Sequence, residues 1–312
     1  MNSKDPTPAA PARGQTQREH RRVRVGVVQM AAGDARDVNV ERALAGIREA
    51  AAQGAELVCL QELFATPYFC QVESAELFDL AEAVDGPTNT AVARAAREAG
   101  VTVLSSFFER RAPGLYHNTA ILYGPTGESL GMYRKMHIPD DPQYYEKFYF
   151  TPGDLGFVSL RAGQLNVGPL VCWDQWYPEA ARLTALAGAE LLMYPTAIGW
   201  LPEDKAVYGK DQLSAWQTMQ RSHAIANGVF VVVANRVGVE QGAGGDAIEF
   251  WGHSFICDPY GKVIAEAGEE AAVLVADCDL GLIEQARRGW PFLRDRRIDA
   301  YGGLERRFGR PS

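Results

Sequence analysis

The feature that most constrains the fold is the alternation of short apolar runs with helical patterns along most of the chain. Residues 23–30 have the composition of a buried strand, and residues 38–53 carry apolar side chains at the spacing of an amphipathic helix. The same order returns at 165–172, a predicted strand, and 178–188, a predicted helix. Because alternating strands and helices bury their apolar faces against one another in layers, the pattern predicts an α/β fold.

Two segments contain the turn residues typical of β-hairpins. Residues 118–135 enclose GPTGE and residues 253–268 enclose DPYG, which combine proline and glycine with polar turn formers. Hairpins among strand–helix units indicate mixed sheets. Residues 136–154 contain three prolines and are expected to be an irregular loop. The other expected strands are 55–60, 101–110, 189–195, 228–238 and 271–280, and the other expected helices are 88–99 and 211–227.

The composition along the chain predicts one domain with two extensions. No linker-like stretch interrupts residues 23–280, so we expect a single domain there. Residues 1–22 are rich in Pro, Ala and charge and have no apolar segment like that of a secretory signal, so a disordered tail is expected. Residues 281–312 are basic and aromatic, and are expected to form an arm that contacts another subunit.

Charge and cysteine content exclude several classes of function. The formal net charge of −8 gives no basic footprint for nucleic acid or an anionic membrane, and no run of about 18 apolar residues is long enough to cross a bilayer. The five cysteines include no C-x-x-C pair, so neither a disulfide framework nor a zinc site is indicated, and a reducing cytoplasm is expected. Nucleotide-binding glycine loops and the G-x-S-x-G elbow are also missing.

Three polar residues stand where apolar runs stop: Glu62, Lys135 and Cys172. Taken singly, each has an ordinary explanation as a core cysteine, a solvated glutamate or a surface lysine. Together they supply a nucleophile, a base and a cation. A thiol has a pKa of about 8.5 and benefits from a carboxylate that takes its proton as it attacks. An ammonium stabilises the oxyanion that forms. This chemistry needs no metal and no other cofactor.

Longer motifs around these residues resemble the nitrilase superfamily of carbon–nitrogen hydrolases. The matching segments are LVCLQELF, YRKMHIPDDPQYYEKFYFTPGD, CWDQWYPEAARLTALAGAELLMYPTAIG, RSHAIANGVFVVVANRVG and FWGHSFICDPYGKVIAEAG, which span about residues 24–280. The resemblance implies a four-layer α-β-β-α sandwich with two mixed sheets. It also implies catalytic roles for Glu62, Lys135 and Cys172, with Glu146 as a second carboxylate, and assembly into dimers or larger homo-oligomers.

The segments CWDQWYPEAAR and HIPDDPQYYEKFYFTPGD further resemble the branch that hydrolyses N-carbamoylputrescine, a carbamoyl amine. In that reading Cys172 attacks the carbamoyl carbon, Glu62 moves the proton, and Lys135 with the Trp173 N–H holds the oxyanion. The substrate ammonium needs a carboxylate or an aromatic face. The candidates for substrate contact are Trp173, Asp174, Trp176, Tyr177, Glu203 and Asp204.

Competing interpretations remain open at this level. Asp174 has an alternative role in holding its own turn, Glu203 and Asp204 in a solvated loop, and the aromatic residues in the core or an interface. The reaction has alternatives as well: a β-ureidopropionase-like or ω-amidase activity, a nitrilase proper, or a catalytically idle member that only binds ligands.

Overall fold

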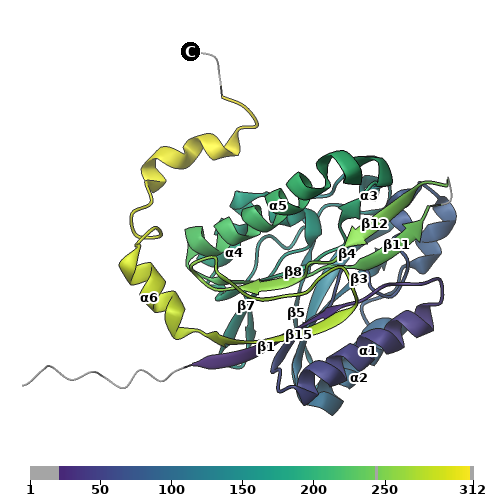
Figure 1. Ribbon diagram of the computed structural model, residues 1–312, viewed down its shortest axis with the longest axis horizontal. Helices are drawn as coiled ribbons and strands as arrows, with labels where there is room; N and C mark the ends of the chain where they lie inside the picture. The colour runs from purple at the N-terminus through teal and green to yellow at the C-terminus, as the bar shows by residue number, and fades with distance from the viewer. Residues whose placement is uncertain (1–20, 243–244, 310–312) are drawn as a thin grey trace, which may run out of the picture.

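The computed structural model describes residues 21–242 and 245–309 and consists of stacked layers with an arm that leaves the body (Figure 1). Residues 1–20 of the expected tail lie outside the described residues, whereas Arg22 already begins the first strand.

The first sheet comes mainly from the N-terminal half of the chain. Its strands are β1 (Arg22–Gln29), β2 (Leu57–Cys59), β3 (Thr102–Ala112), β4 (Leu115–Tyr123), β5 (Ser129–Arg134) and β15 (Ala272–Asp279). Their order in space is β15-β1-β2-β3-β4-β5. β2 is parallel to both of its neighbours, and the other three pairs are antiparallel, so the sheet is mixed.

The second sheet repeats this pattern with the C-terminal half. Its strands are β6 (Leu160–Ala162), β7 (Leu165–Pro169), β8 (Leu191–Pro195), β10 (Phe230–Ala234), β13 (Phe255–Cys257) and β14 (Val263–Glu266). Their order is β14-β13-β10-β8-β7-β6, in which β8 is parallel to both neighbours. Read from β6 to β14, the parallel and antiparallel pairs follow the same succession as from β15 to β5, so the two halves share a topology and not only an element order.

Helices cover the outer faces of both sheets. They are α1 (Arg36–Ala52), α2 (Pro87–Ala99), α4 (Pro178–Leu186) and α5 (Pro202–Asn227). In Figure 1, α1 and α2 lie on the first sheet and α4 and α5 on the second. Proline in the first turn of three of them and left-handed glycine after α2 (Gly100, φ +66°) and α5 (Gly228, φ +58°) set their ends. The four-layer α-β-β-α sandwich is therefore confirmed.

Two large apolar cores separate these layers. One lies beneath α1 and α2 and includes Ile47, Val92 and Val103. The other fills the space between the sheets and beneath α4 and α5, and includes Leu104 and Val232. This second core ends where the strands give way to the polar residues of the candidate site.

Several element boundaries differ from the sequence prediction. The strand expected at 228–238 is interrupted after Ala234, and its remainder joins a third, small sheet of β11 (Val237–Gln241), β12 (Ala247–Trp251) and β9 (Gly199–Trp200). The expected loop 136–154 contains one helical turn, α3 (Glu146–Tyr149). α5 begins nine residues before the expected position 211, because Pro202 opens a first turn that carries no apolar periodicity.

The arm consists of α6 (Gly281–Gly289) and a 3₁₀ helix, η4 (Ile298–Glu305), and extends beyond the sandwich in Figure 1. Its exposed apolar side chains are Trp290, Phe292, Ile298, Tyr301, Leu304 and Phe308.

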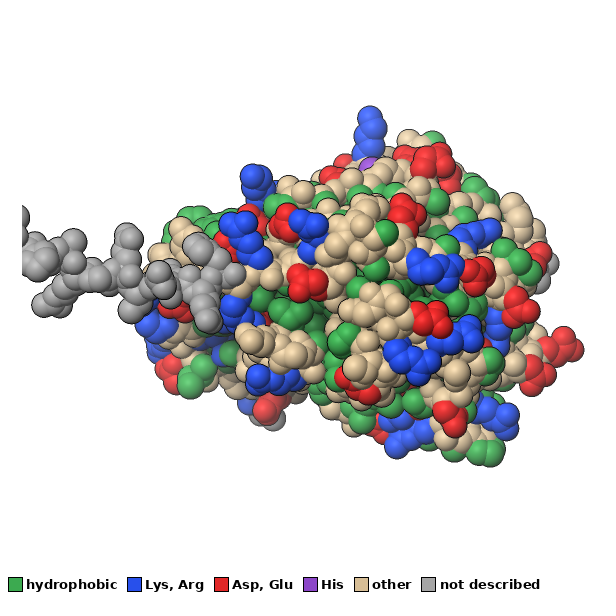
Figure 2. Space-filling view, turned by 90° about the horizontal axis from the view of Figure 1, so that it is seen from below, with side chains coloured by type: hydrophobic (Ala, Val, Ile, Leu, Met, Phe, Trp, Pro, Cys, Tyr) green, Lys and Arg blue, Asp and Glu red, His purple; other side chains and the backbone are tan. Residues whose placement is uncertain are grey.

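Within residues 21–242 and 245–309, no helix has the length and apolarity needed to span a bilayer. Figure 2, which views the molecule from below Figure 1, shows basic and acidic side chains interspersed over that face. A mixed surface of this kind gives no single-sign patch there for a polyanion.

Candidate active site

Three chain segments bring the expected catalytic residues to one end of the sandwich. Glu62 follows β2, Lys135 follows β5 directly, and Cys172 opens a short 3₁₀ helix, η3 (Cys172–Trp176), beyond β7. The sequence placed Cys172 at the end of a strand, but β7 ends at Pro169 and the cysteine lies in the turn after it. The site is therefore built on the ends of strands from both sheets.

Lys135 links two carboxylates in the protein interior. Its ammonium donates to Glu62 Oε1 over 2.8 Å and to Glu146 Oε2 over 2.7 Å, and all three side chains are fully buried. Glu146 reaches the lysine because α3 begins there. Direct hydrogen bonds thus join three of the four residues that are expected to act in catalysis.

Two further residues, which the sequence did not identify, donate hydrogen bonds to these carboxylates. Asn118 donates to Glu62 Oε1 over 2.7 Å, and the Tyr68 hydroxyl donates to Glu146 Oε1 over 2.7 Å. Among the described residues, Glu62 Oε2 is buried and has no hydrogen-bond partner. Asn118 lies between two other polar residues of β4, His117 and Thr119, so its polarity did not single it out, and nothing near Tyr68 pointed to a residue 78 positions away.

The charges of the cluster perturb one another. Burial lowers the pKa of Lys135, but the adjacent carboxylates of Glu146 and Glu62 outweigh it and hold that pKa well above its ordinary value. Burial raises the pKa of Glu146, and the Lys135 ammonium only partly opposes this shift. The lysine is therefore a permanent cation at neutral pH.

Cys172 is held in an unusual conformation at the edge of this cluster. Its φ of +40° lies in the left-handed region, which is costly for a residue with a side chain. Its sulfur faces the Ala197 carbonyl at 3.8 Å and lines a cavity. Burial, reinforced by Glu62 and opposed by Lys135, raises the pKa of the thiol well above its usual value. The resting thiol is therefore neutral and needs a base to become a nucleophile.

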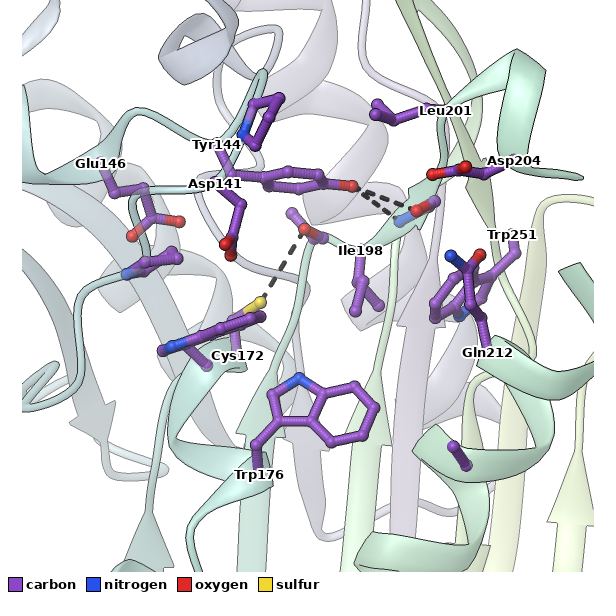
Figure 3. Close-up of a pocket in the computed structure, with 16 residues that line it drawn as sticks. Asp141, Tyr144, Glu146, Cys172, Trp176, Ile198, Leu201, Asp204, Gln212 and Trp251 are labelled. Atoms are coloured by element: carbon purple, nitrogen blue, oxygen red, sulfur yellow. Dashed lines mark hydrogen bonds between the residues drawn. The ribbon is translucent and has the colours of Figure 1, made fainter. Parts of the chain in front are cut away.

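The cavity in front of the thiol has a volume of about 410 Å³. Figure 3 shows Glu146 and Cys172 on one side of it and Asp204, Gln212 and Trp251 on the other. Most of the lining is apolar or aromatic, with a few polar groups, as is usual for small-molecule sites. The lining residues are Pro139, Asp141, Pro142, Tyr144, Glu146, Cys172, Trp173, Trp176, Ala197, Ile198, Gly199, Leu201, Asp204, Gln212, Ala215 and Trp251.

The expected substrate contacts divide into two groups. Trp173, Trp176 and Asp204 line the cavity. Tyr177, Asp174 and Glu203 do not belong to its lining. Tyr177 stacks on His137 with ring centroids 3.7 Å apart. Asp174 is fully buried and bonded within the protein, which agrees with its alternative role in holding the turn.

The alternative that placed Glu203 and Asp204 in a solvated loop was wrong, because these residues belong to the first turn of α5. The helix separates them: Glu203 is exposed to solvent, and Asp204 is half-buried and faces the cavity. No side-chain hydrogen bond or ion pair is found for the Asp204 carboxylate among the described residues.

Arg236, another residue that the sequence did not identify, supports the turn that carries Glu62. Its buried guanidinium donates to the carbonyl oxygens of Glu62 (3.0 Å), Leu63 (2.9 Å) and Thr66 (3.0 Å), and pairs with Glu240 (2.7 Å). Leu63 has a positive φ of 48°, so these bonds hold a backbone that would otherwise relax.

Gly153 lies close to the backbone of Arg134 and Lys135. Its N–H donates to the Lys135 carbonyl over 2.8 Å, and a Cβ at this position would overlap the carbonyl oxygen of Arg134. The close approach of the two chain segments therefore requires glycine.

No cluster of three or more His, Cys, Asp or Glu side chains with the arrangement of a metal site occurs within the described ranges.

Comparisons with known proteins agree with this geometry. The sequence profile described as carbon–nitrogen hydrolase matches residues 24–288. An N-carbamoylputrescine amidase from Solanum tuberosum is 44% identical over 288 residues, covering 91% of this chain and 95% of that protein. A citrullinase from Francisella tularensis is 38% identical, covering 92% of this chain and 99% of that protein.

Among solved structures, a carbon–nitrogen hydrolase from Helicobacter pylori G27 matches with a TM-score of 0.90 at 46% identity. The match covers 93% of this chain and 100% of that one. The similarity therefore extends over the whole layered domain and is not confined to single motifs.

Proposed function

This chain belongs to the carbon–nitrogen hydrolase family, and from that membership we propose that it hydrolyses N-carbamoylputrescine to putrescine, carbon dioxide and ammonia. The observation that carries the proposal is the state of Glu62. One of its oxygens accepts from Lys135 and Asn118, and the other is buried with no hydrogen-bond partner among the described residues. The carboxylate is also near enough to the Cys172 thiol to raise the pKa of that thiol. A general base needs such a free oxygen.

The proposed reaction begins with attack of Cys172 on the carbamoyl carbon. Sγ forms a bond to that carbon, the thiol proton passes to Glu62, and the carbonyl electrons move to oxygen. The oxyanion is held by the Lys135 ammonium and the Trp173 N–H. When the oxyanion collapses, one C–N bond breaks and the leaving nitrogen takes the proton from Glu62.

Water completes the cycle. Glu62 removes a proton from water, whose oxygen attacks the thiocarbamate carbon; the C–S bond then breaks, and Glu62 returns the proton to the sulfur. A carbamic acid results whichever nitrogen leaves first, and it splits into carbon dioxide and the remaining nitrogen compound, putrescine or ammonia. Glu146 orients Lys135 through its 2.7 Å hydrogen bond and is itself held by Tyr68.

The side of the cavity opposite the thiol supports a preference for a substrate that ends in an ammonium. Asp204 places a carboxylate on the same side of the cavity as Trp251, and Trp173 and Trp176 supply apolar walls. A chain that ends in an ammonium alone gains a charge-assisted contact with Asp204, whereas citrulline brings an α-carboxylate, a like charge, together with its α-ammonium. The distal charge of the substrate therefore favours the diamine over the amino acid.

The test compares wild-type protein with two neighbouring variants. Ammonia release is measured for N-carbamoylputrescine, citrulline, N-carbamoyl-β-alanine, an ω-amide and an aliphatic nitrile. N-carbamoylputrescine should give the highest kcat/KM. Asp204→Asn should raise its KM about tenfold or more, because a hydrogen bond to a charged group is lost. Glu203→Gln is the matched control, since the adjacent carboxylate points to solvent, and should leave KM unchanged.

Two outcomes would overturn parts of this proposal. A better kcat/KM for citrulline, for N-carbamoyl-β-alanine or for an ω-amide would reject the diamine and retain the hydrolase. If the protein bound these compounds but hydrolysed none of them, the hydrolase proposal would be rejected in favour of a catalytically idle member that only binds ligands.

The same proposal includes assembly and location. Residues 281–312 provide the subunit contact of a homo-oligomer, supported by the exposed apolar side chains of an arm that extends beyond the sandwich. All five cysteines are free, which fits a reducing cytoplasm. Removal of residues 290–312 should shift the mass measured by sedimentation towards a smaller species, and an unchanged mass would reject the contact.

A further inference from the structure

We infer that Asp174 is a positioning residue that fixes the nucleophile relative to the lysine. Its carboxylate bonds to chain segments on both sides of Lys135 and to the residue before Cys172. The inference goes beyond the proposed function and uses it only for the substrate in the kinetic assay.

The geometry of the carboxylate shows the connection. Oδ2 accepts from the Tyr133 hydroxyl (2.8 Å) and from the Val171 N–H (3.0 Å). Oδ1 accepts from the His137 backbone N–H (3.0 Å) and lies 2.8 Å from His137 Nδ1. Tyr133 and His137 stand two residues before and two residues after Lys135. One buried side chain therefore ties the segment that carries the lysine to the turn that carries the thiol.

The same residue closes the strained turn of the nucleophile. The Asp174 N–H donates to the Val171 carbonyl over 3.0 Å, while its side chain receives the Val171 N–H. Both bonds span Cys172, whose φ is +40°. Strained backbone persists only where its surroundings over-determine it, and here two reciprocal hydrogen bonds across the cysteine do so.

Only a carboxylate satisfies these neighbours. The Tyr133 hydroxyl and the two backbone N–H groups donate to it, and the 2.8 Å contact to His137 Nδ1 is a fourth donation when that nitrogen carries the proton. An asparagine has the same size but accepts on one atom only, so its NH₂ faces either the Val171 N–H or the His137 N–H. The stack of Tyr177 on His137 keeps the imidazole in place.

A role for Asp174 as a substrate contact fits the structure less well. The residue is fully buried and is not part of the cavity lining, whereas its neighbour Trp173 is. A change at Asp174 should therefore act on the geometry of the thiol and the lysine, and the binding of substrate should remain nearly as it is.

The experiment measures Asp174→Asn in the full chain by two readouts. The kcat for N-carbamoylputrescine should fall about 100-fold with KM within about twofold, because a small misplacement of reacting groups has an effect of that size. The alkylation rate of Cys172 by iodoacetamide, followed by peptide mass, should also fall. Ile47→Ala, in the core beneath α1, is the stability-matched control and should lose thermal stability without losing kcat or alkylation rate.

Tyr133→Phe removes one donor and should give a smaller fall in kcat, which keeps the inference testable if Asp174→Asn does not fold. Unchanged kcat in both variants would overturn the inference, and so would a raised KM with unchanged kcat. If the wild-type protein hydrolysed no carbamoyl amine, the proposed function would be rejected. The role of Asp174 could still be tested, because alkylation of Cys172 needs no substrate.

Discussion

Two regions of this protein are equally buried and are held together by different physics. Beneath α1 and α2, apolar side chains such as Ile47 and Val92 are wholly removed from water. At the end of the sandwich, the ionisable side chains of Glu62, Lys135 and Glu146 are as deeply buried. Burial stabilises the first region roughly in proportion to its apolar area, and penalises the second unless each charge finds a partner. The comparison teaches that depth alone does not distinguish a scaffold from a reactive centre.

The sharpest test of this contrast removes the thiol. Cys172→Ala should lower kcat by about 10⁴-fold or more, as expected for loss of a nucleophile, and should change the melting temperature little because the lost atom lines a cavity. Cys278→Ala, in the core strand β15, is the control and should lower the melting temperature while activity is kept. Ammonia release and thermal unfolding measure the two effects, and residual turnover near the wild-type rate in Cys172→Ala would refute the assignment.

Replacing the cation should affect both properties together. Lys135→Met removes the proposed oxyanion partner and should lower kcat by roughly 10²–10³-fold. It also leaves the buried carboxylates of Glu62 and Glu146 facing each other without a counter-ion, so the melting temperature at pH 7 should fall as well. A variant that kept its kcat and lost only stability would show that the lysine is structural.

A truncation in the apolar region should have the opposite profile. Ile47→Ala deletes three buried carbons and should reduce the free energy of unfolding by about 3 kcal/mol. Because Ile47 belongs to a different core from the site, kcat should stay within about twofold of wild type. Urea unfolding and steady-state kinetics on the same preparation test this, and a parallel loss of kcat would mean that the two regions are coupled.

The smallest expected effect concerns acid stability next to the site. Arg134 pairs with the buried Glu109 at 2.7 Å. Burial alone raises the pKa of Glu109, but hydrogen bonds from Arg134 and Thr119 outweigh it and hold that pKa below 4.5, its ordinary value. The ionised carboxylate therefore stabilises the fold above pH 4.5, and this contribution is lost as the pH falls through the lowered pKa.

Glu109→Gln has no such proton to bind. Its melting temperature should be lower than that of wild type at pH 7, and the difference should narrow between pH 5 and pH 3. Thermal unfolding across this range is the measurement, and parallel curves for the two proteins would contradict the expected linkage.

The predictable part of the fold is the part encoded locally. α2 (Pro87–Ala99) begins one residue before the predicted helix 88–99 and ends where that helix was expected to end, and β1 (Arg22–Gln29) agrees with the predicted strand 23–30 to within one residue at each end. β9 was missed, because its two residues become a strand only by pairing with β12. The first turns of α5 were missed for a similar reason, since they carry no apolar period of their own.

The same division applies to the site. Glu62, Lys135 and Cys172 stand at ends of apolar runs, and the family motifs around them supplied their roles. Asn118 and Arg236 bond to Glu62, and Tyr68 bonds to Glu146, through contacts between residues 56 to 174 positions apart in the chain. Such partners depend on how the strands assemble in space, and one sequence holds no local trace of that assembly. Asp174 was predicted as a candidate for substrate contact, and it is buried and not part of the cavity lining.

Gly153 has a consequence for anyone who wishes to make this enzyme more robust. Exchanging glycine for alanine is a common route to heat resistance, because it narrows the freedom of the denatured chain. Here the added methyl would push against the Arg134 carbonyl, one residue before Lys135. At this position the exchange would therefore lower heat resistance and displace the segment that carries the lysine.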